Sequence, residues 1–117
     1  MKFILSTHNV TLTKAIEDHL LSRIEKIEHR DRFVTSIRVT LEHDHLKIPE
    51  RQFICTMRLA APGPDLFAAD SERDLYAAID LVTKKLEQQL RKRHNKYKAR
   101  SHTLGSRTKR SRQGKED

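Results

Sequence analysis

Hydrophobic residues recur at helical intervals in the first third of the chain. They are three or four residues apart, which places them on one stripe of an amphipathic helix that runs to about His29. Thr13 precedes this stripe and is a suitable N-cap residue for the helix. The stripe consists of Ile16, Leu20, Ile24 and Ile27.

A second helical pattern begins after residue 70. Ser71 followed by Asp74 fits a capping box at its start. The next position on its apolar stripe after Leu90 would be Arg93, so we expect the packed part of this helix to end near Leu90 and its cations to continue beyond that point. The stripe consists of Leu75, Ile79, Val82, Leu86 and Leu90.

Between the two helices the hydrophobic period changes to two, which predicts half-buried strands. The polar segment 43–50, which contains Pro49, is expected to form a hairpin loop, and 61–64 is expected to form a second turn. Inward-facing residues of the two central strands include Cys55 and Met57. Strands are predicted at 2–6, 34–42, 53–59 and 66–69.

The predicted order of elements is therefore β-α-β-β-β-α. Both helix stripes can cover one face of a four-stranded sheet, which gives an α/β (α+β) two-layer sandwich and leaves the other sheet face exposed. We assign residues 1–100 to this domain. Residues 101–117 have no apolar period and are rich in Ser, Arg, Lys and Gly, so we predict a disordered basic tail.

Positive charge is concentrated in the last third of the chain. The net charge is +8 overall, but residues 1–83 carry 11 Lys and Arg against 13 Asp and Glu, a balance of −2. Residues 84–117 carry 13 Lys and Arg against 3 Asp and Glu, a balance of +10. This asymmetry indicates a polyanionic partner, either nucleic acid or an anionic membrane surface, although a solvated basic tail would give the same count.

The second helix carries most of the candidate binding residues. Glu87 is the only acid between Lys84 and Arg100, whereas a solvated helix usually mixes both signs of charge. The first helix has a weaker cationic row, which Asp18 and Glu25 dilute. We predict RNA binding by Lys84, Lys85, Arg91, Lys92, Lys96 and Lys98 on the second helix, with Arg23, Lys26 and Arg30 on the first.

Other functional classes fit the sequence less well. A membrane-surface helix would need large apolar anchors, and the chain has no Trp. Cys55 is expected in the core, and His43, Asp44 and His45 lie in a turn without a well-spaced third ligand, so we predict no catalysis, no metal and no cofactor. The single cysteine and the lack of a signal peptide favour the cytoplasm.

The mode of RNA binding also follows from the composition. Stacking of single-stranded bases would need exposed aromatic residues on the sheet, and the chain has four Phe and two Tyr, with Phe53 expected to face inward. We therefore expect recognition of structured RNA through backbone charge and shape.

Two segments resemble the short ribosome hibernation-promoting factor and ribosome-associated inhibitor family of bacteria, also described as sigma-54 modulation proteins. They are DLYAAIDLVTKKLEQQLRKRHNK at 74–96 and STHNVTLTKAIEDHLLSRIEKIEHR at 6–30. The resemblance covers about residues 1–98 and has the same order of elements. It implies the fold of the family, which looks like a double-stranded-RNA-binding domain. The cationic helix surface of the family corresponds here to Lys84, Lys85, Arg91 and Lys92, with Arg23, Lys26 and Arg30 as the contribution of the first helix.

The resemblance implies a function without chemistry. Members of the family bind the small ribosomal subunit and its ribosomal RNA in the mRNA and tRNA channel near the decoding centre, which inhibits translation and stabilises idle ribosomes in stationary phase or stress. A cytoplasmic protein that is monomeric when free, with no membrane and no small-molecule substrate, is expected. Two alternatives remain open, namely a sigma-factor-modulating protein-interaction module and a binder of free double-stranded RNA.

Overall fold

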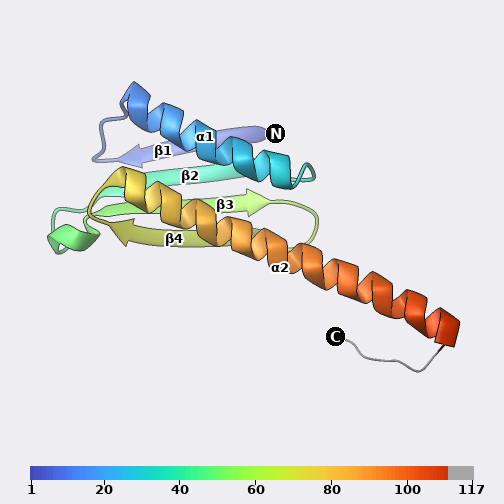
Figure 1. The fold of residues 1–117 in the computed structure, drawn as a ribbon. Coiled ribbons are helices and arrows are strands. Elements are labelled where there is room, and N and C mark those ends of the chain that lie inside the picture. The colour runs from blue at the N-terminus through green and yellow to red at the C-terminus, as the bar shows by residue number, and fades with distance from the viewer. Residues whose placement is uncertain (111–117) are drawn as a thin grey trace. The chain divides into compact units, whose positions relative to one another are not determined.

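Four strands form one sheet in the order β1-β2-β3-β4 (Figure 1). The computed structural model describes the backbone of residues 1–110 and the side chains of residues 1–95. Strand β1 (Lys2–His8) is parallel to β2 (Ser36–His43), while β3 (Phe53–Ala60) and β4 (Leu66–Glu72) continue the sheet as antiparallel hairpins. All four predicted strands are confirmed, and β1 and β4 extend further than the sequence predicts.

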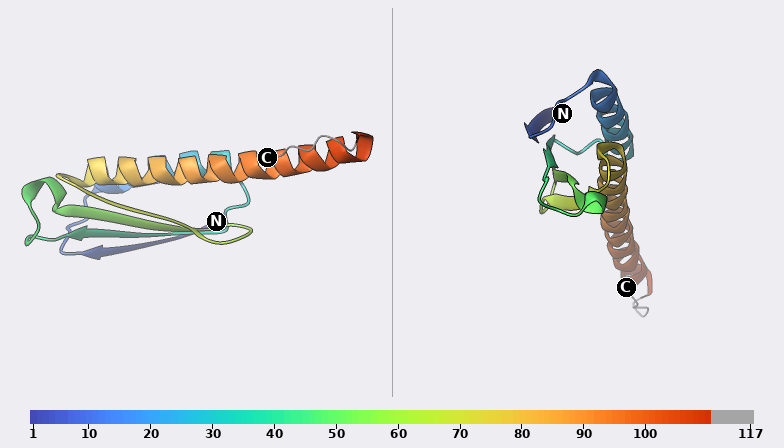
Figure 2. Two further views of the ribbon diagram at one scale, coloured as in Figure 1. Left: turned by 90° about the horizontal axis from the view of Figure 1, so that it is seen from below. Right: turned by 90° about the vertical axis from the view of Figure 1, so that its left-hand side faces the viewer.

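Two helices accompany the sheet, α1 (Lys14–Arg30) and α2 (Leu75–Arg110), and a short 3-10 turn, η1 (Pro49–Arg51), lies in the β2–β3 connection. The chain divides into two compact units at residue 87. Within Met1–Glu87, α1 and the first part of α2 lie on the same face of the sheet (Figure 2). The predicted β-α-β-β-β-α order and two-layer α+β class are confirmed.

The core of the first unit lies between this sheet face and the helices. The predicted alternation holds, because the inward residues of β2 and β3 are fully buried, apart from the half-buried pair His43 and Phe53 at one end. Arg38 and Arg58, between the inward positions, are exposed. The predicted helix stripes are buried as well, apart from the half-buried Ile16. Fully buried side chains include Leu20, Ile27, Ile37, Val39, Leu41, Cys55, Met57, Leu59, Ile79, Val82 and Leu86.

The two helices begin with different capping residues. The Thr13 hydroxyl accepts a hydrogen bond from the Ile16 backbone N–H at 3.2 Å, so the predicted cap of α1 is confirmed. The capping box predicted from Ser71 is wrong. Ser71 pairs with Ile54 inside the sheet, and the carboxylate of Asp74 accepts from the Ala77 N–H at 2.8 Å instead. Strand pairing thus extends through Ser71, and the helix begins later.

Helix α2 continues through Arg110, so the backbone of residues 101–110 is helical where the sequence predicts a disordered tail. No proline interrupts this segment, and Gly105 is its only glycine. The rest of the predicted tail, 111–117, lies outside the described residues. Over the described part of the chain, neither helix has the length and apolar character needed to cross a bilayer.

Candidate nucleic-acid interface

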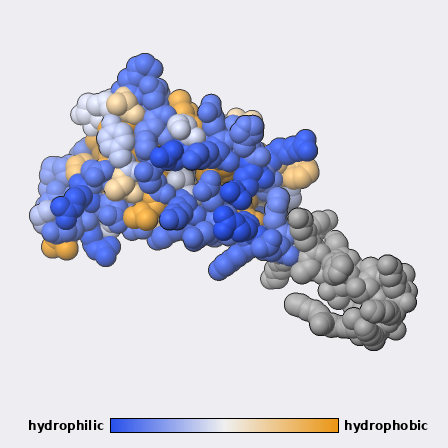
Figure 3. Space-filling view, viewed as in Figure 1, coloured by the Kyte–Doolittle hydropathy of each residue, from blue (hydrophilic) through white to orange (hydrophobic). Residues whose placement is uncertain are grey.

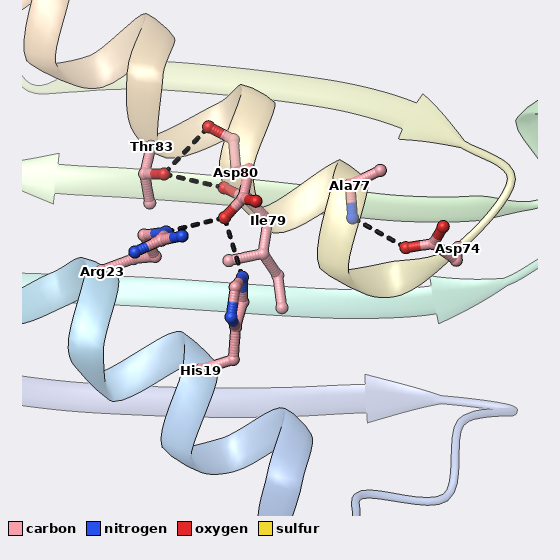
Figure 4. A network of polar contacts seen from close by, with 7 residues as sticks. All are labelled: His19, Arg23, Asp74, Ala77, Ile79, Asp80 and Thr83. Atoms are coloured by element: carbon pink, nitrogen blue, oxygen red, sulfur yellow. Dashed lines mark hydrogen bonds and ion pairs between the residues drawn. The ribbon is translucent and has the colours of Figure 1, made fainter.

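The carboxylate of Asp80 on α2 holds two side chains of α1. Its Oδ1 accepts from Nε of Arg23 at 2.7 Å and lies 2.7 Å from Nε2 of His19 (Figure 4). The hydroxyl of Thr83, one turn further along α2, donates to the Ile79 carbonyl at 2.9 Å. The His19 ring also meets the edge of Tyr76, with centroids 5.1 Å apart. The contacts of His19 and Arg23 with α2 link the two helices, whereas the Thr83 hydrogen bond lies within α2.

The charge of Asp80 is stabilised by this arrangement. Partial burial acts to raise the pKa of the carboxyl, but the hydrogen bonds and charges of Arg23 and His19 outweigh it, so the pKa of Asp80 is lowered overall. The carboxylate therefore remains ionised at neutral pH. Because the side chain of Asp80 is 45% exposed, the ion pairs are screened by water and contribute modestly to stability.

Arg23 is consequently only partly available to a ligand. Its side chain is 30% exposed and uses Nε for Asp80, while its other N–H donors can bind elsewhere. Lys26 and Arg30, further along α1, are exposed, and neither forms an ion pair within the described part of the chain. They are the more accessible members of the predicted row on α1.

The two adjacent lysines of α2 differ in their surroundings. Lys84 is exposed. Lys85 forms an ion pair with Asp70 at 3.2 Å and donates to the Ala69 carbonyl at 3.2 Å, which ties α2 to β4. The carboxylate of Asp70 is more buried than the lysine that it meets. Lys85 therefore has a structural contact that the sequence did not indicate, because Asp70 follows the predicted end of the strand.

Arg91 and Lys92 belong to the second unit and are both exposed. Lys96 and Lys98 are part of the helical backbone of α2, but their side chains lie outside the described residues. The face of the molecule over α1 and the described part of α2 is mainly hydrophilic, with small, separate apolar patches (Figure 3). Such a surface suits a charged, hydrated ligand better than an apolar one.

Cys55, His43 and His45 were considered in the sequence as candidates for catalysis or metal binding, and the structure shows their surroundings. Cys55 is buried, and burial raises the pKa of its thiol to about 12, so the thiol stays protonated at neutral pH. The His43 ring stacks on Phe53 with centroids 4.1 Å apart and lies 3.9 Å from the ring of His45. Among the described residues, no group of three or more His, Cys, Asp or Glu side chains is placed to hold a metal ion.

Comparison with known proteins identifies the family. The sequence model described as "Sigma 54 modulation protein / S30EA ribosomal protein" matches residues 3–98, which is most of the chain. The chain belongs to the S30EA family. The resemblance inferred from the two sequence segments is therefore confirmed.

Several S30EA relatives match over a similar range. A ribosome hibernation promoting factor of Azotobacter vinelandii is 33% identical over 97 residues, which cover 82% of this chain and 85% of that protein. The corresponding Pseudomonas putida protein is 28% identical, and 82% of this chain matches 89% of it. A ribosome hibernation promotion factor of Deinococcus radiodurans is 31% identical over 80% of this chain. The chain spans about half the length of that relative, namely 49%.

Solved structures share the fold of this S30EA member. A ribosomal subunit interface protein from Coxiella burnetii aligns with a TM-score of 0.70 at 20% identity and covers 81% of this chain and 99% of its own. The N-terminal domain of Protein Y from Thermus thermophilus aligns with a TM-score of 0.65 at 22% identity and covers 79% of this chain and 98% of its own. At these identities the similarity establishes the fold.

Two acidic residues of the interface were not predicted from the sequence. Asp80 and Asp70 bind the candidate residues Arg23 and Lys85, respectively. A partial signal for Asp80 was present, because it is the one acid within the otherwise apolar DLYAAIDLV segment after Asp74. No comparable signal identifies Asp70, since its partner depends on how the strand and the helix are placed.

Proposed function

We propose that the chain is a ribosome hibernation factor. It binds the small ribosomal subunit and its ribosomal RNA, and in this way inhibits translation and stabilises idle ribosomes in stationary phase or stress. The observation that carries the proposal is the row of cations on α2. Between Lys84 and Arg100 this row contains only one acid, Glu87. The names of the relatives, which refer to ribosome hibernation, support the same conclusion.

The cationic surface acts by charge and shape. Exposed Lys84, Arg91 and Lys92 bind phosphates of folded RNA, together with Lys26 and Arg30 of α1. Helical spacing predicts that Lys96 and Lys98 extend this row. Lys85 and Arg23 contribute less direct binding, because each already has a carboxylate partner. Occupancy of the mRNA and tRNA channel near the decoding centre then blocks initiation without any catalytic step.

The family description also mentions modulation of sigma 54, but the names of the matched relatives refer to ribosomes, so we favour the ribosome as the partner. The free protein is expected to be a cytoplasmic monomer. Neither a membrane nor a small-molecule substrate is needed for this function.

Sedimentation with vacant ribosomes tests the proposal. The wild-type protein is expected to migrate with the small subunit on a sucrose gradient and to protect decoding-region RNA from chemical modification. The variant Lys84→Glu, Arg91→Glu, Lys92→Glu should remain at the top of the gradient, because it reverses the charges that face phosphate. Its circular dichroism should match that of the wild type.

A variant with the same change in net charge provides the control. Lys47→Glu, Arg51→Glu and Arg73→Glu alter exposed cations outside the predicted surface. This control is expected to bind like the wild type. Equal loss of binding by both variants would mean that only net charge matters, and retained binding by the α2 variant would refute the assignment of the site.

A further inference from the structure

The sheet face that no helix covers carries an unusual row of side chains. Strand pairing places Arg38 of β2 directly opposite Arg58 of β3, and Arg58 directly opposite Phe67 of β4. Arg38 also pairs with Ile4 of β1, the strand that lies on the other edge of β2. Residues opposite one another in neighbouring strands point to the same face, so these four form one line across all four strands.

Phe67 and Arg58 form an exposed cation–π pair within this row. The guanidinium carbon of Arg58 lies 5.4 Å from the centroid of the Phe67 ring, and Phe67 is 49% exposed. Arg58 also approaches Asp65 at 3.7 Å, a long ion pair at an exposed site. Planar groups of this kind, aromatic and guanidinium together, are surfaces on which a nucleobase can stack.

The neighbouring positions leave room for a ligand. On the open face, the next row along the sheet consists of Ser6, Thr40, Thr56 and Ala69, and the row on the other side contains Lys2, Ser36 and Ala60. Apart from Lys2 on β1, these side chains are short, so a flat base could lie against the sheet beside Phe67. The hydroxyl groups can donate to or accept from such a ligand.

The charge of this face favours an anion. Arginines directly opposite one another repel, which costs stability unless an anion lies between them. Within the described part of the chain no carboxylate is ion-paired with Arg38. An acidic peptide would use the arginines but not the ring, and duplex RNA keeps its bases stacked inside the helix. A single-stranded RNA supplies both phosphates and accessible bases.

We propose that the open face of the sheet is a second RNA-binding surface, which takes single-stranded RNA. A base stacks on Phe67 next to Arg58, and the adjoining phosphates bind Arg38 and Arg58. The surface is separate from Lys26, Arg30 and Lys84, because within Met1–Glu87 the helices lie on the opposite side of the sheet (Figure 2). It goes beyond the proposed ribosome binding and does not depend on it.

An NMR titration of the full-length, 15N-labelled protein with oligouridine of about eight to ten nucleotides tests this surface. The protein should carry the triple Glu substitution in α2, which removes competing attraction to the helix. The amide signals of Arg38, Thr56, Arg58 and Phe67 are expected to shift on binding. Shifts confined to α1 and α2, or no shift at all, would overturn the proposal.

Conservative substitutions of Phe67 separate stacking from packing. Phe67→Tyr keeps an aromatic ring and should bind like its parent, whereas Phe67→Leu keeps an apolar side chain and should bind at least about fivefold more weakly. Phe33→Leu is the matched control, because Phe33 is 66% exposed but lies before β2 and outside this face. Unchanged affinity of Phe67→Leu would contradict base stacking.

Two competitors define the ligand. Duplex RNA of similar length should leave the Phe67 signal unperturbed, and polyglutamate should not displace the oligouridine at equal charge concentration. Displacement by polyglutamate would reduce the surface to a general anion site and overturn the assignment to RNA. These outcomes do not involve ribosomes, so they remain distinguishable from a failure of the proposed hibernation function.

Discussion

A single carboxylate, Asp80, determines how one predicted RNA-binding residue is used. Arg23 was predicted as a phosphate ligand, and it lies on the expected flank of α1, but it donates to Asp80 at 2.7 Å. The same oxygen meets His19. Arg23 therefore has a role in positioning α1 against α2 in addition to any contact with RNA.

The pH dependence of stability should reflect this carboxylate. Since the pKa of Asp80 is lowered in the folded protein, its stabilisation is complete above the unfolded pKa of about 4 and is lost as the pH falls through the folded value. Asp80→Asn should reduce the free energy of unfolding by on the order of 1 kcal/mol at neutral pH. Urea unfolding monitored by circular dichroism should show this difference shrinking in acid.

Asp18→Asn is a suitable comparison for that experiment, because Asp18 forms only an exposed ion pair with Lys14 one turn away. Its effect should be smaller than that of Asp80→Asn. If the difference in the free energy of unfolding between the wild type and Asp80→Asn did not change with pH, the lost stability would come from packing rather than from charge.

At the scale of the elements, the starts of the helices show what a local pattern can and cannot specify. Thr13 directly precedes the first helical residue and caps α1 as its sequence context predicts. Ser71 also satisfies a local capping pattern, but β4 continues through it to Glu72 because β3 offers pairing partners that far. The tertiary pairing of the strand overrides the local signal, and Asp74 caps α2.

Alanine substitutions should separate these capping residues. Thr13→Ala and Asp74→Ala should each lower the free energy of unfolding by about 1 kcal/mol, because each leaves a backbone N–H of the first turn without its acceptor. Ser71→Ala should cost clearly less. Chemical denaturation of the three variants side by side would check this, and a larger cost for Ser71→Ala than for Asp74→Ala would contradict the assignment of the cap.

Much of the fold was predictable because periodicity reports burial directly. The stripe from Leu75 to Leu90 and the alternation around Met57 identify core positions without knowledge of their neighbours. The contacts between individual side chains could not be predicted in the same way. Some contacts join residues of different elements, so they depend on the strand register and on how the helix packs. Examples are the ion pair of Lys85 with Asp70 and the cation–π contact of Arg58 with Phe67.

At the scale of the whole chain, the division into two units nearly coincides with a division of charge. Met1–Glu87 contains 13 Lys and Arg against 14 Asp and Glu, a balance of −1. Gln88–Asp117 contains 11 Lys and Arg against 2 Asp and Glu, a balance of +9. The first unit supplies the packed core, and the second supplies all of the net positive charge.

Binding to ribosomes should therefore depend steeply on salt. If the proposed surface contacts about six to ten phosphates, the affinity for ribosomes should fall roughly 10³- to 10⁵-fold between about 50 and 200 mM salt. This range assumes the salt dependence of proteins that bind duplex DNA. Filter binding or sedimentation at several potassium concentrations would measure the slope. The triple Glu variant in α2 should give a much shallower slope, and a flat response of the wild type would exclude a mainly electrostatic interface.

The parallel pairing of β1 with β2 has a consequence for the order in which the chain acquires its structure. Strands β2, β3 and β4 are joined by short connections and can associate as hairpins, whereas β1 reaches β2 only after α1 has crossed over. As an edge strand with this late-forming pairing, β1 should exchange its amide hydrogens faster than β2 and β3 do. The N-terminal strand would then be the first part of the sheet to detach and the last to join.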